Sequence, residues 1–403
     1  GSSMKQCVIT SAVRTAVGTY LGSLRTLRSI DLVVPILLEA VRRSNLTPSQ
    51  VDQVILGEVT GVGNLGRSAL LKAGFPVTTP GYTVDRQCGS SLQAVVNAVQ
   101  EINSGNGDII ISGGAESMSR MFYILPPECR YESFRAGSVK IYDMFEYITS
   151  VAVQPPELFP DLNMGITAEN VAERYQISRE EQDAFAYDSQ MKTKRAQACG
   201  LFQEEILPLK FTVQNQPVVF DADEHPRPQT TPEALAKLRP VFRKDGTVTA
   251  GNSSGRNDGA SAVVVMSAEK ALALGCAPMV KIVSYAIAGV DPRVMGLGPA
   301  PAIQKAVRQA GLTLKDIGLF ELNEAFAAQA LGVLTELGML PGTEMYQRIN
   351  VNGGAIAHGH ALGNSGTRIL TTLIYEMKRQ NVQYGLASLC IGGGQGIAMT
   401  LQR

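Results

Sequence analysis

The sequence predicts an α/β fold built from two duplicated halves, with a long segment inserted between them. Residues 40–59 and 306–325 align without gaps, and seven of the 20 paired residues are identical. Each copy has the pattern of a helix, a turn and a strand. In a second match, residues 95–114 and 370–394 each have the pattern of a helix followed by a glycine-ended strand. Two copies of one helix and strand order are typical of α/β halves related by duplication.

The first half starts in a strand pattern at Cys7 and reaches its most informative point at Cys88. Cys88 follows a β-branched and polar stretch, and apolar residues at helical spacing begin at Leu92. Backbone amides and the dipole at a helix start favour the thiolate, which is the nucleophilic form of cysteine. Cys88 is therefore a candidate nucleophile, and a small buried structural cysteine is the alternative.

The segment between the halves is rich in proline, aromatic and charged residues. Interleaved acidic and basic residues predict one long helix over residues 165–198. We expect a first half of residues 4–119 and 250–270, and a second half of residues 271–403. We expect residues 120–249 to form a loop domain that covers the cleft between the halves.

The second half carries reactive side chains at the ends of regular elements, where catalytic groups are commonly mounted. A glycine-dense run contains His358 and His360 and leads into a helix predicted over residues 367–378. Cys390 lies near the end of a predicted buried strand, just before three glycines. Because Cys88 and His360 precede corresponding helices of the two copies, we expect them to face each other across a shared cleft.

Composition excludes several classes of function. The 403 residues carry 36 basic and 36 acidic side chains, so nothing supports a nucleic-acid or anionic-membrane partner. No apolar run reaches the roughly 18 residues of a membrane helix. The six cysteines show no C-x-x-C spacing, which argues against a disulfide scaffold or structural zinc. Residues 1–3 resemble an expression scar, no signal segment follows, and we expect a cytoplasmic protein.

His358 and His360 form an H-x-H pair, a spacing that can bind a metal ion. The chain has only three histidines, and no carboxylate cluster is near the pair. We therefore expect no metal site. His358 is expected to be a loop residue that hydrogen-bonds to the backbone.

The chain resembles the thiolases from its first strand to Leu401. Seven motifs carry the resemblance in the family's order: C-G-S-S-L-Q-A at 88–94, G-G-A-E-S-M-S at 113–119, T-A-G-N-S-S-G-R-N-D-G-A at 249–260, V-D-P-R-V-M-G-L-G-P at 290–299, N-E-A-F-A-A-Q at 323–329, G-G-A-I-A-H-G-H at 353–360 and C-I-G-G-G at 390–394. The resemblance implies a layered α-β-α-β-α thiolase fold. It also implies coenzyme A and acetyl-CoA as substrates, with no permanently bound cofactor.

The resemblance also implies catalytic roles. Cys88 matches the nucleophile that carries the acyl group as a thioester, and His360 matches the histidine that activates it. Cys390 matches the second cysteine, an acid/base that moves protons to and from carbon or sulfur. Asn323 matches an asparagine that holds a water, and this water and His360 make one oxyanion site. Backbone amides of Cys88 and Gly392 make the other, since Claisen condensation creates two separate oxyanions.

Contacts with coenzyme A also follow from the resemblance. Ser254 matches a residue beside the pantetheine arm, and Arg227 matches an arginine near the nucleotide end. Five further residues match pocket walls: Ala250, Gly255, Met164, Met295 and Phe326. For the methionines and Phe326, plain core packing is the alternative.

The chain departs from the family pattern at positions that leave the catalytic set intact. The unusual residues are Ser91, Asn163, Arg256, His358 and Ala361. Residues 121–162 also lack the family's usual loop sequence. These departures leave chain-length preference and the contacts of a tetramer open.

We expect reversible condensation of two acetyl-CoA molecules to acetoacetyl-CoA and coenzyme A, by a homotetramer built as a dimer of dimers. Bulky Met295 and Phe326 would close the acyl end of the pocket. The first alternative is a 3-ketoacyl-CoA thiolase of β-oxidation that prefers longer chains. The second alternative is a carrier-protein β-ketoacyl synthase. Such enzymes usually have histidine at the position of Asn323 and lack Cys390, so these two residues argue against it. The intact catalytic set argues against a third alternative, a noncatalytic scaffold.

Overall fold

The computed structural model describes residues 4–132, 134 and 136–403, so the interpretation of residues 1–3 lies outside the described residues. Its centre is a ten-stranded sheet. The strands follow one another in the order β12 (Leu319–Leu322), β13 (Tyr384–Ile391), β14 (Gln395–Gln402), β11 (Val280–Gly289), β1 (Cys7–Arg14), β10 (Asn257–Ser267), β5 (Ile109–Ser117), β3 (Gln53–Gly57) and β4 (Gly81–Val84). The short strand β2 (Gly18–Thr19) pairs with β10.

The pairing pattern confirms the duplication. In the first half, β3 is parallel to β5, and β5, β10 and β1 then pair antiparallel in succession. In the second half, β12 is parallel to β13, and β13, β14 and β11 pair antiparallel in the same way. Only three residues of β1, Cys7 to Ile9, join the halves by pairing with β11.

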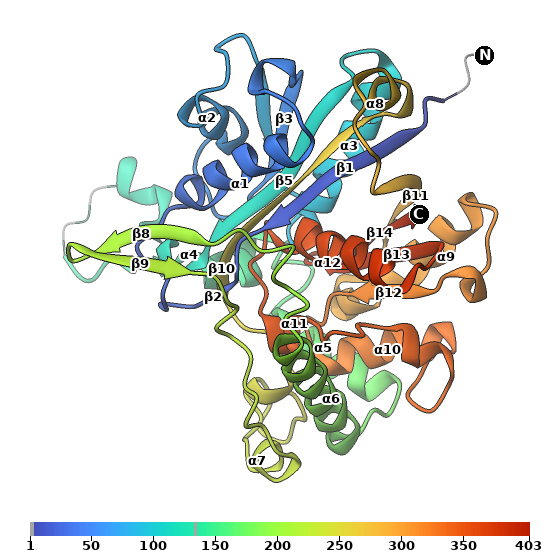
Figure 1. The fold of residues 1–403 in the computed structure, drawn as a ribbon. Helices are drawn as coiled ribbons and strands as arrows, with labels where there is room; N and C mark the ends of the chain where they lie inside the picture. Colours follow the sequence, from blue (N-terminus) through green and yellow to red (C-terminus); the bar gives the residue numbers. More distant parts are fainter. Residues whose placement is uncertain (1–3, 133, 135) are drawn as a thin grey trace.

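Alternating side chains of each half-sheet feed two different cores, as the pleat of a strand dictates. The outer faces are covered by α1 (Ser29–Arg43) and α2 (Leu65–Lys72) in the first half, and by α9 (Pro299–Gln309) and α10 (Ala327–Leu337) in the second. Between the halves lie α3 (Ser90–Ser104) and α12 (Ser365–Gln380), as Figure 1 shows. These helices and sheets form the expected α-β-α-β-α layers. Helix α8 (Ala268–Leu274) connects β10 to β11.

The two central helices touch at their N-terminal ends. A Cβ atom on Gly366 of α12 would lie 2.5 Å from the backbone nitrogen of Leu92 in α3. Only glycine permits this close approach, because a Cβ atom cannot sit so near a backbone atom. The contact brings the loop that ends at Cys88 beside the loop that contains His360.

The inserted segment differs from the prediction in one element. The single helix predicted over residues 165–198 is wrong, because the chain forms α5 (Met164–Arg174) and α6 (Arg179–Ala198). Gln176 breaks the helix with a φ of 52°. Ser178 and Glu181 then form a capping box that starts α6.

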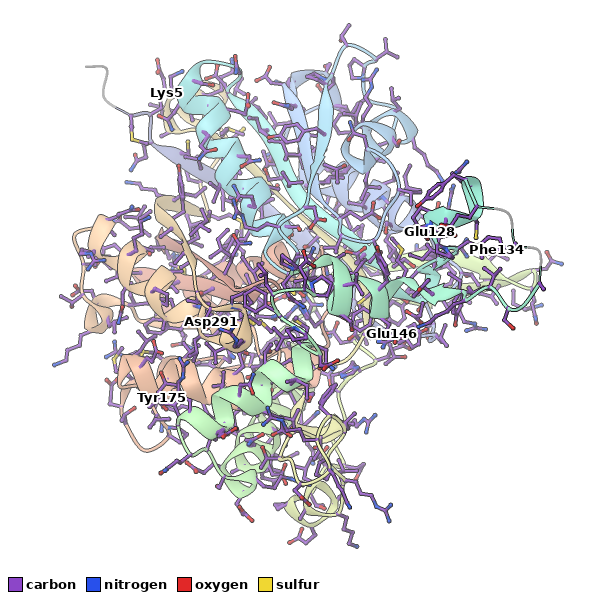
Figure 2. The ribbon with its side chains drawn as sticks, turned by 180° about the vertical axis from the view of Figure 1, so that it is seen from behind. Lys5, Glu128, Phe134, Glu146, Tyr175 and Asp291 are labelled. Atoms are coloured by element: carbon purple, nitrogen blue, oxygen red, sulfur yellow. The ribbon has the colours of Figure 1, made fainter. Side chains whose placement is uncertain are left out.

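Short elements make up the rest of the insertion and the loop before α12. They are β6 (Tyr123–Ile124), β7 (Tyr142–Asp143), α4 (Met144–Tyr147), a π-helical turn (Ile148–Ala152), β8 (Leu209–Val213), β9 (Gln216–Phe220), α7 (Pro232–Ala236) and α11 (Ala355–His358). Figure 2 shows Phe134 at the far edge of the molecule and Glu146 nearer its centre. Among the described residues, no helix combines the length and apolar character that crossing a membrane requires.

Candidate active site

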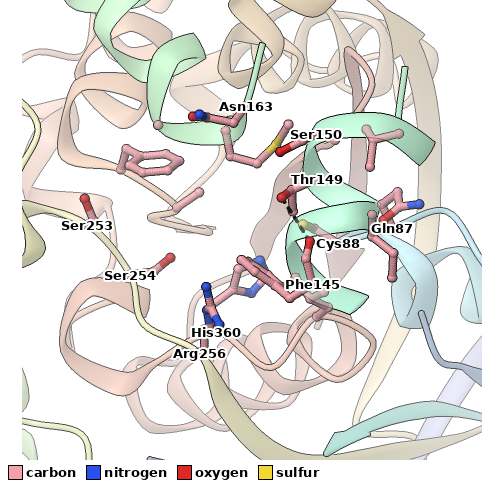
Figure 3. A pocket seen from close by; sticks show the side chains of 18 of the residues that line it. Gln87, Cys88, Phe145, Thr149, Ser150, Asn163, Ser253, Ser254, Arg256 and His360 are labelled. Atoms are coloured by element: carbon pink, nitrogen blue, oxygen red, sulfur yellow. Dashed lines mark hydrogen bonds between the residues drawn. The ribbon is translucent and has the colours of Figure 1, made fainter. Parts of the chain in front are cut away.

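Four of the five sequence-predicted catalytic residues line one cavity of about 510 Å³ (Figure 3). Cys88, His360, Cys390 and Gly392 all line it. So do five of the residues expected to contact coenzyme A: Met164, Ser254, Gly255, Met295 and Phe326. The inserted segment supplies a large part of the wall, with lining residues between Asp143 and Gly165.

Three predicted site residues do not line this cavity. Ala250 and Arg227 are exposed and lie elsewhere on the surface. Asn323 follows β12 directly and is buried, and its backbone N–H donates to the Ser388 carbonyl over 3.0 Å. Among the described residues, neither polar atom of the Asn323 side chain has a hydrogen-bond partner. A buried amide without a partner is costly, so this side chain is suited to hold a small polar group.

Cys88 sits on a tight turn between β4 and α3. Gln87 just before it has a φ of 47°, in the left-handed region that non-glycine residues seldom adopt. This conformation turns the chain sharply and leaves Cys88 at the cavity, two residues before α3 begins. Such strain is commonly found at functional sites.

Backbone amides at the turn before α3 favour the Cys88 thiolate, as the sequence predicts, but burial has the larger effect. Burial raises the pKa of the Cys88 thiol to about 12, although hydrogen bonding from the backbone of Gly392 and of Cys88 itself acts to lower this pKa. Removal from water disfavours the charged form more than these two groups stabilise it. The resting nucleophile is therefore a thiol, and its reaction needs a base.

His360 is held in one orientation from two sides. Its backbone N–H donates to the Asn257 side-chain oxygen over 2.8 Å, and its Nδ1 lies 2.5 Å from the Ser365 hydroxyl oxygen. The Ser365 hydroxyl donates to the Ala361 carbonyl over 3.1 Å. The hydroxyl therefore accepts from Nδ1–H of His360, which leaves the lone pair on Nε2.

His360 is consequently equipped to act as a base. Its Nε2 has no partner among the described residues. Burial, followed by the nearby Arg368 charge, lowers the pKa of His360 to about 4. The ring is therefore neutral near pH 7, with its free nitrogen available to take a proton.

Cys390 lies near the end of β13 and is buried. The turn to β14 follows, and Gly393 and Gly394 have φ values of 91° and 93°, which glycine adopts without strain. Burial raises the pKa of the Cys390 thiol above its usual range, and proximity to Cys88 adds to this shift. Two thiols of raised pKa thus share the cavity.

His358 lies away from the cavity lining and is buried. Its Nε2 is 3.0 Å from the Asn352 carbonyl oxygen, which confirms the expected hydrogen bond to the backbone. Its Nδ1 is 3.4 Å from the Asp223 carboxylate, and its ring packs edge-on against Phe202. His358 therefore anchors the loop that carries His360. The described residues contain no cluster of three metal-ligating side chains.

Several functional contacts were missed in the sequence. Asn257 and Ser365 orient His360, and Glu116 accepts backbone N–H groups from Val59 and Gly363 at 2.9 Å each. Burial, then the charge of nearby Glu58, raises the pKa of Glu116 to about 7. Asn257 and Glu116 lie inside recognisable motifs, which was a usable signal.

Comparison with known proteins agrees with this geometry. Residues 7–269 match the family described as "Thiolase, N-terminal domain", and residues 276–403 match "Thiolase, C-terminal domain". An acetyl-CoA acetyltransferase of Allochromatium vinosum is 48% identical over 400 residues, which cover 98% of each chain. One of Escherichia coli is 47% identical and covers 99% of this chain and 100% of the relative.

Solved structures give the same result. The acetyl-CoA acetyltransferase of Bacillus anthracis superposes with a TM-score of 0.94 at 42% identity, over 100% of both chains. Human mitochondrial 3-ketoacyl-CoA thiolase in complex with CoA has a TM-score of 0.91 at 41% identity, over 99% of this chain and 98% of that one. The chain belongs to the thiolase family.

Proposed function

We propose that this protein is an acetyl-CoA C-acetyltransferase that reversibly condenses two acetyl-CoA molecules to acetoacetyl-CoA and coenzyme A. The observation that carries the proposal is the cavity shared by Cys88, His360, Cys390 and Gly392. It joins a thiol, a neutral base, a second thiol and a backbone amide. The names of the relatives at 47–48% identity point to the same activity.

In the first half-reaction, Nε2 of His360 takes the proton of Cys88 as the sulfur attacks the carbonyl carbon of acetyl-CoA. The backbone amides of Cys88 and Gly392 stabilise the oxyanion, which a preorganised pair of donors does at low cost. The C–S bond to coenzyme A breaks, and the leaving sulfur receives the proton of Cys390, which becomes a thiolate. The product is an acetyl thioester on Cys88.

In the second half-reaction, Cys390 as thiolate removes a proton from the methyl group of a second acetyl-CoA. The Nε2–H of His360 and a water held by Asn323 stabilise the resulting enolate oxygen. The carbanion attacks the Cys88 thioester and forms the new carbon–carbon bond. Cys88 then leaves as a thiolate and regains its proton from Nε2–H of His360, and acetoacetyl-CoA is released.

We assign the coenzyme A contacts as a separate part of the proposal. Ser254, Gly255, Met164, Met295 and Phe326 would hold the pantetheine arm and the acyl group, and their place around the cavity supports this. Ala250 and Arg227 do not line the cavity, so the cavity lining does not support their assignment. Coenzyme A acts as substrate, and no permanently bound cofactor is required by these steps.

We further propose the division into residues 4–119 with 250–270, residues 120–249, and residues 271–403. We propose a cytoplasmic homotetramer, formed as a dimer of dimers. Support for assembly comes from apolar side chains that the insertion exposes, including Phe122, Tyr123 and Ile141. Six free cysteines are compatible with a reducing compartment.

The roles of Cys88 and Cys390 are tested by measuring acetylation and condensation separately. After mixing with acetyl-CoA, mass spectrometry should find an acetyl group on the peptide that contains Cys88, and Cys88→Ser should abolish it. Cys390→Ala should keep this acetylation and reduce condensation by about 10²–10⁴-fold, the usual contribution of a general acid–base group. An acetyl group on the Cys390 peptide, or full condensation by Cys390→Ala, would overturn the assignment.

A longer-chain 3-ketoacyl-CoA thiolase is the second candidate, favoured by similarity to the human mitochondrial enzyme at 40–41% identity. Thiolysis rates on four-, six- and eight-carbon 3-ketoacyl-CoA esters decide between the two. Efficiency should be greatest for acetoacetyl-CoA. A steady rise toward the eight-carbon ester would favour the second candidate.

A further inference from the structure

We propose that Phe145 forms a further wall that limits acyl-chain length beside Cys88, in addition to Met295 and Phe326, and that Arg256 holds Phe145 in place. Phe145 would be a specificity-determining residue and Arg256 a positioning residue. The inference rests on the proposed thiolase activity of the same site. It concerns which ketoacyl esters the site accepts.

The first observation is the place of the Phe145 ring. Phe145 lies on the short helix α4 of the inserted segment and lines the cavity. It packs against a small apolar cluster of Val59, Met118 and Leu362, and Cys88 packs against the same cluster. The ring therefore shares the apolar wall of the cavity with the reactive cysteine, and we infer that the alkyl end of an acyl group extends along this wall.

The second observation is a stack that covers Phe145. The guanidinium carbon of Arg256 lies 4.0 Å from the centre of the Phe145 ring and 5.6 Å from that of Tyr20. Figure 3 shows Phe145 and Arg256 together beside Cys88 and His360. A guanidinium over an aromatic face at this distance is an attractive cation–π contact.

Arg256 has no competing partner within the part of the chain that the structure describes. Among the described residues, the side-chain contacts of its guanidinium are those with the rings of Phe145 and Tyr20. By contrast, Arg293, which stacks on Phe159 at 5.0 Å, is also paired with Asp291. The stack on Phe145 is thus the main contact of the Arg256 head group.

The third observation explains why Phe145 needs such support. Helix α4 spans only Met144–Tyr147 and passes into a π-helical turn, and none of the nine residues from 144 to 152 is buried. Asp143 caps it by accepting the N–H groups of Phe145 and Glu146. A helix this short has little stability of its own, so its side-chain contacts set its position.

These three observations predict the consequence for substrate choice. A two-carbon acyl group on Cys88 needs little room, whereas each added methylene of a longer ketoacyl chain extends toward the Phe145 ring. Discrimination by an apolar wall is worth about 10–200-fold per methylene. Removing the ring should therefore open the site to longer chains.

The experiment compares thiolysis efficiency on four-carbon and eight-carbon 3-ketoacyl-CoA esters. Phe145→Ala should raise the ratio of eight-carbon to four-carbon efficiency at least about tenfold. Arg256→Leu should raise it less, and Arg256→Lys, which keeps the charge over the ring, should restore part of the discrimination. The double variant should match Phe145→Ala alone, because Arg256 acts through Phe145.

Phe159→Ala is the matched control, because Phe159 stacks under an arginine but does not line the cavity. Its ratio should equal that of the wild type. Phe145→Leu serves if Phe145→Ala does not fold, and it should shift the ratio in the same direction. Melting temperatures verify that each variant is folded.

The outcomes separate this inference from the proposed function. A wild type that already prefers the eight-carbon ester would overturn the short-chain function. The role of Phe145 is tested separately, by the change in the ratio of eight-carbon to four-carbon efficiency between the wild type and the variants. An unchanged ratio in folded Phe145→Ala or Phe145→Leu would overturn the wall. A further shift on adding Arg256→Leu to Phe145→Ala would overturn the positioning role and mean that Arg256 meets the acyl chain directly.

Discussion

At the scale of single residues, burial decides the chemistry of the site. Cys88 and His360 both have shifted pKa values that favour their neutral forms. A thiol beside a neutral imidazole with a free Nε2 reacts when the proton moves between them. Neither residue has to carry a charge in the resting enzyme, which would be costly in a buried pocket.

The raised pKa of Cys88 predicts how its alkylation depends on pH. Iodoacetamide reacts with the thiolate, and below the pKa the thiolate fraction rises tenfold per pH unit. With a pKa of about 12, the alkylation rate of Cys88 should keep rising through pH 10. Peptide mapping by mass spectrometry measures it, and glutathione in the same mixture should level off first. A plateau near pH 8 would contradict the burial argument.

Replacing His360 should affect catalysis, whereas replacing His358 should affect stability. His360→Asn removes the free Nε2 and should lower kcat by about 10²–10⁴-fold. His358→Asn should leave kcat nearly unchanged but destabilise the protein by about 1–3 kcal/mol, because it disturbs the buried contacts with Asp223 and Asn352. Thermal unfolding and single-turnover kinetics separate the effects. Equal losses of kcat in both variants would mean that the two roles are wrongly divided.

At the scale of elements, the site depends on two central helices that approach at their N-terminal ends. Cys88 precedes α3, and His360 precedes α12. The Ser91 side chain links them by accepting the Thr367 N–H over 2.8 Å. This contact gives Ser91, one of the departures from the family pattern, a structural role.

The close approach predicts that Gly366→Ala is destabilising. An added Cβ would meet the Leu92 backbone nitrogen at 2.5 Å and the Ser91 hydroxyl oxygen at 2.8 Å. Overpacking of this kind costs about 1–3 kcal/mol. Gly63→Ala is the control, since its added Cβ meets nothing within 4 Å. Urea unfolding compares them, and equal midpoints for the two variants would argue against the contact.

At the scale of the whole molecule, the duplicated sheet ends in two edge strands, β4 and β12. Unpaired edges tend to be covered or paired in solution. The insertion adds a second exposed surface, where Tyr123 is 72% exposed and Tyr131 is 71% exposed. Both features favour assembly into a symmetric oligomer.

Light scattering should therefore give the mass of a tetramer. Replacing Tyr123 and Tyr131 by serine should reduce the tetramer to a dimer, since only the surface of the insertion is changed. The same replacement at exposed Leu272, on α8, should leave the mass unchanged. A wild-type dimer would contradict the proposed role of the insertion in tetramer assembly. A wild-type monomer would also contradict the proposed pairing of the sheet edges.

Much of the molecule followed from the sequence because it is encoded locally. The duplication, the central helices and the glycine-ended strand that contains Cys390 follow from periodicity and turn residues. The cavity position of Cys88, His360 and Cys390 followed from motif order and from the symmetry of the copies. The long helix failed because its charge pattern continues through Gln176, where the backbone turns.

Tertiary structure alone decided what depends on neighbours distant in the chain. The sequence determined that a cysteine would stand at a helix start, but burial by surrounding elements reversed its expected pKa shift. His358 contacts Asp223, and Arg256 contacts Phe145, although more than 100 residues of chain separate the members of each pair. No local pattern encodes such contacts, because they arise only when packing brings separate segments together. Local propensity thus determined which elements form. Packing decided the protonation state of the catalytic side chains and the shape of the site.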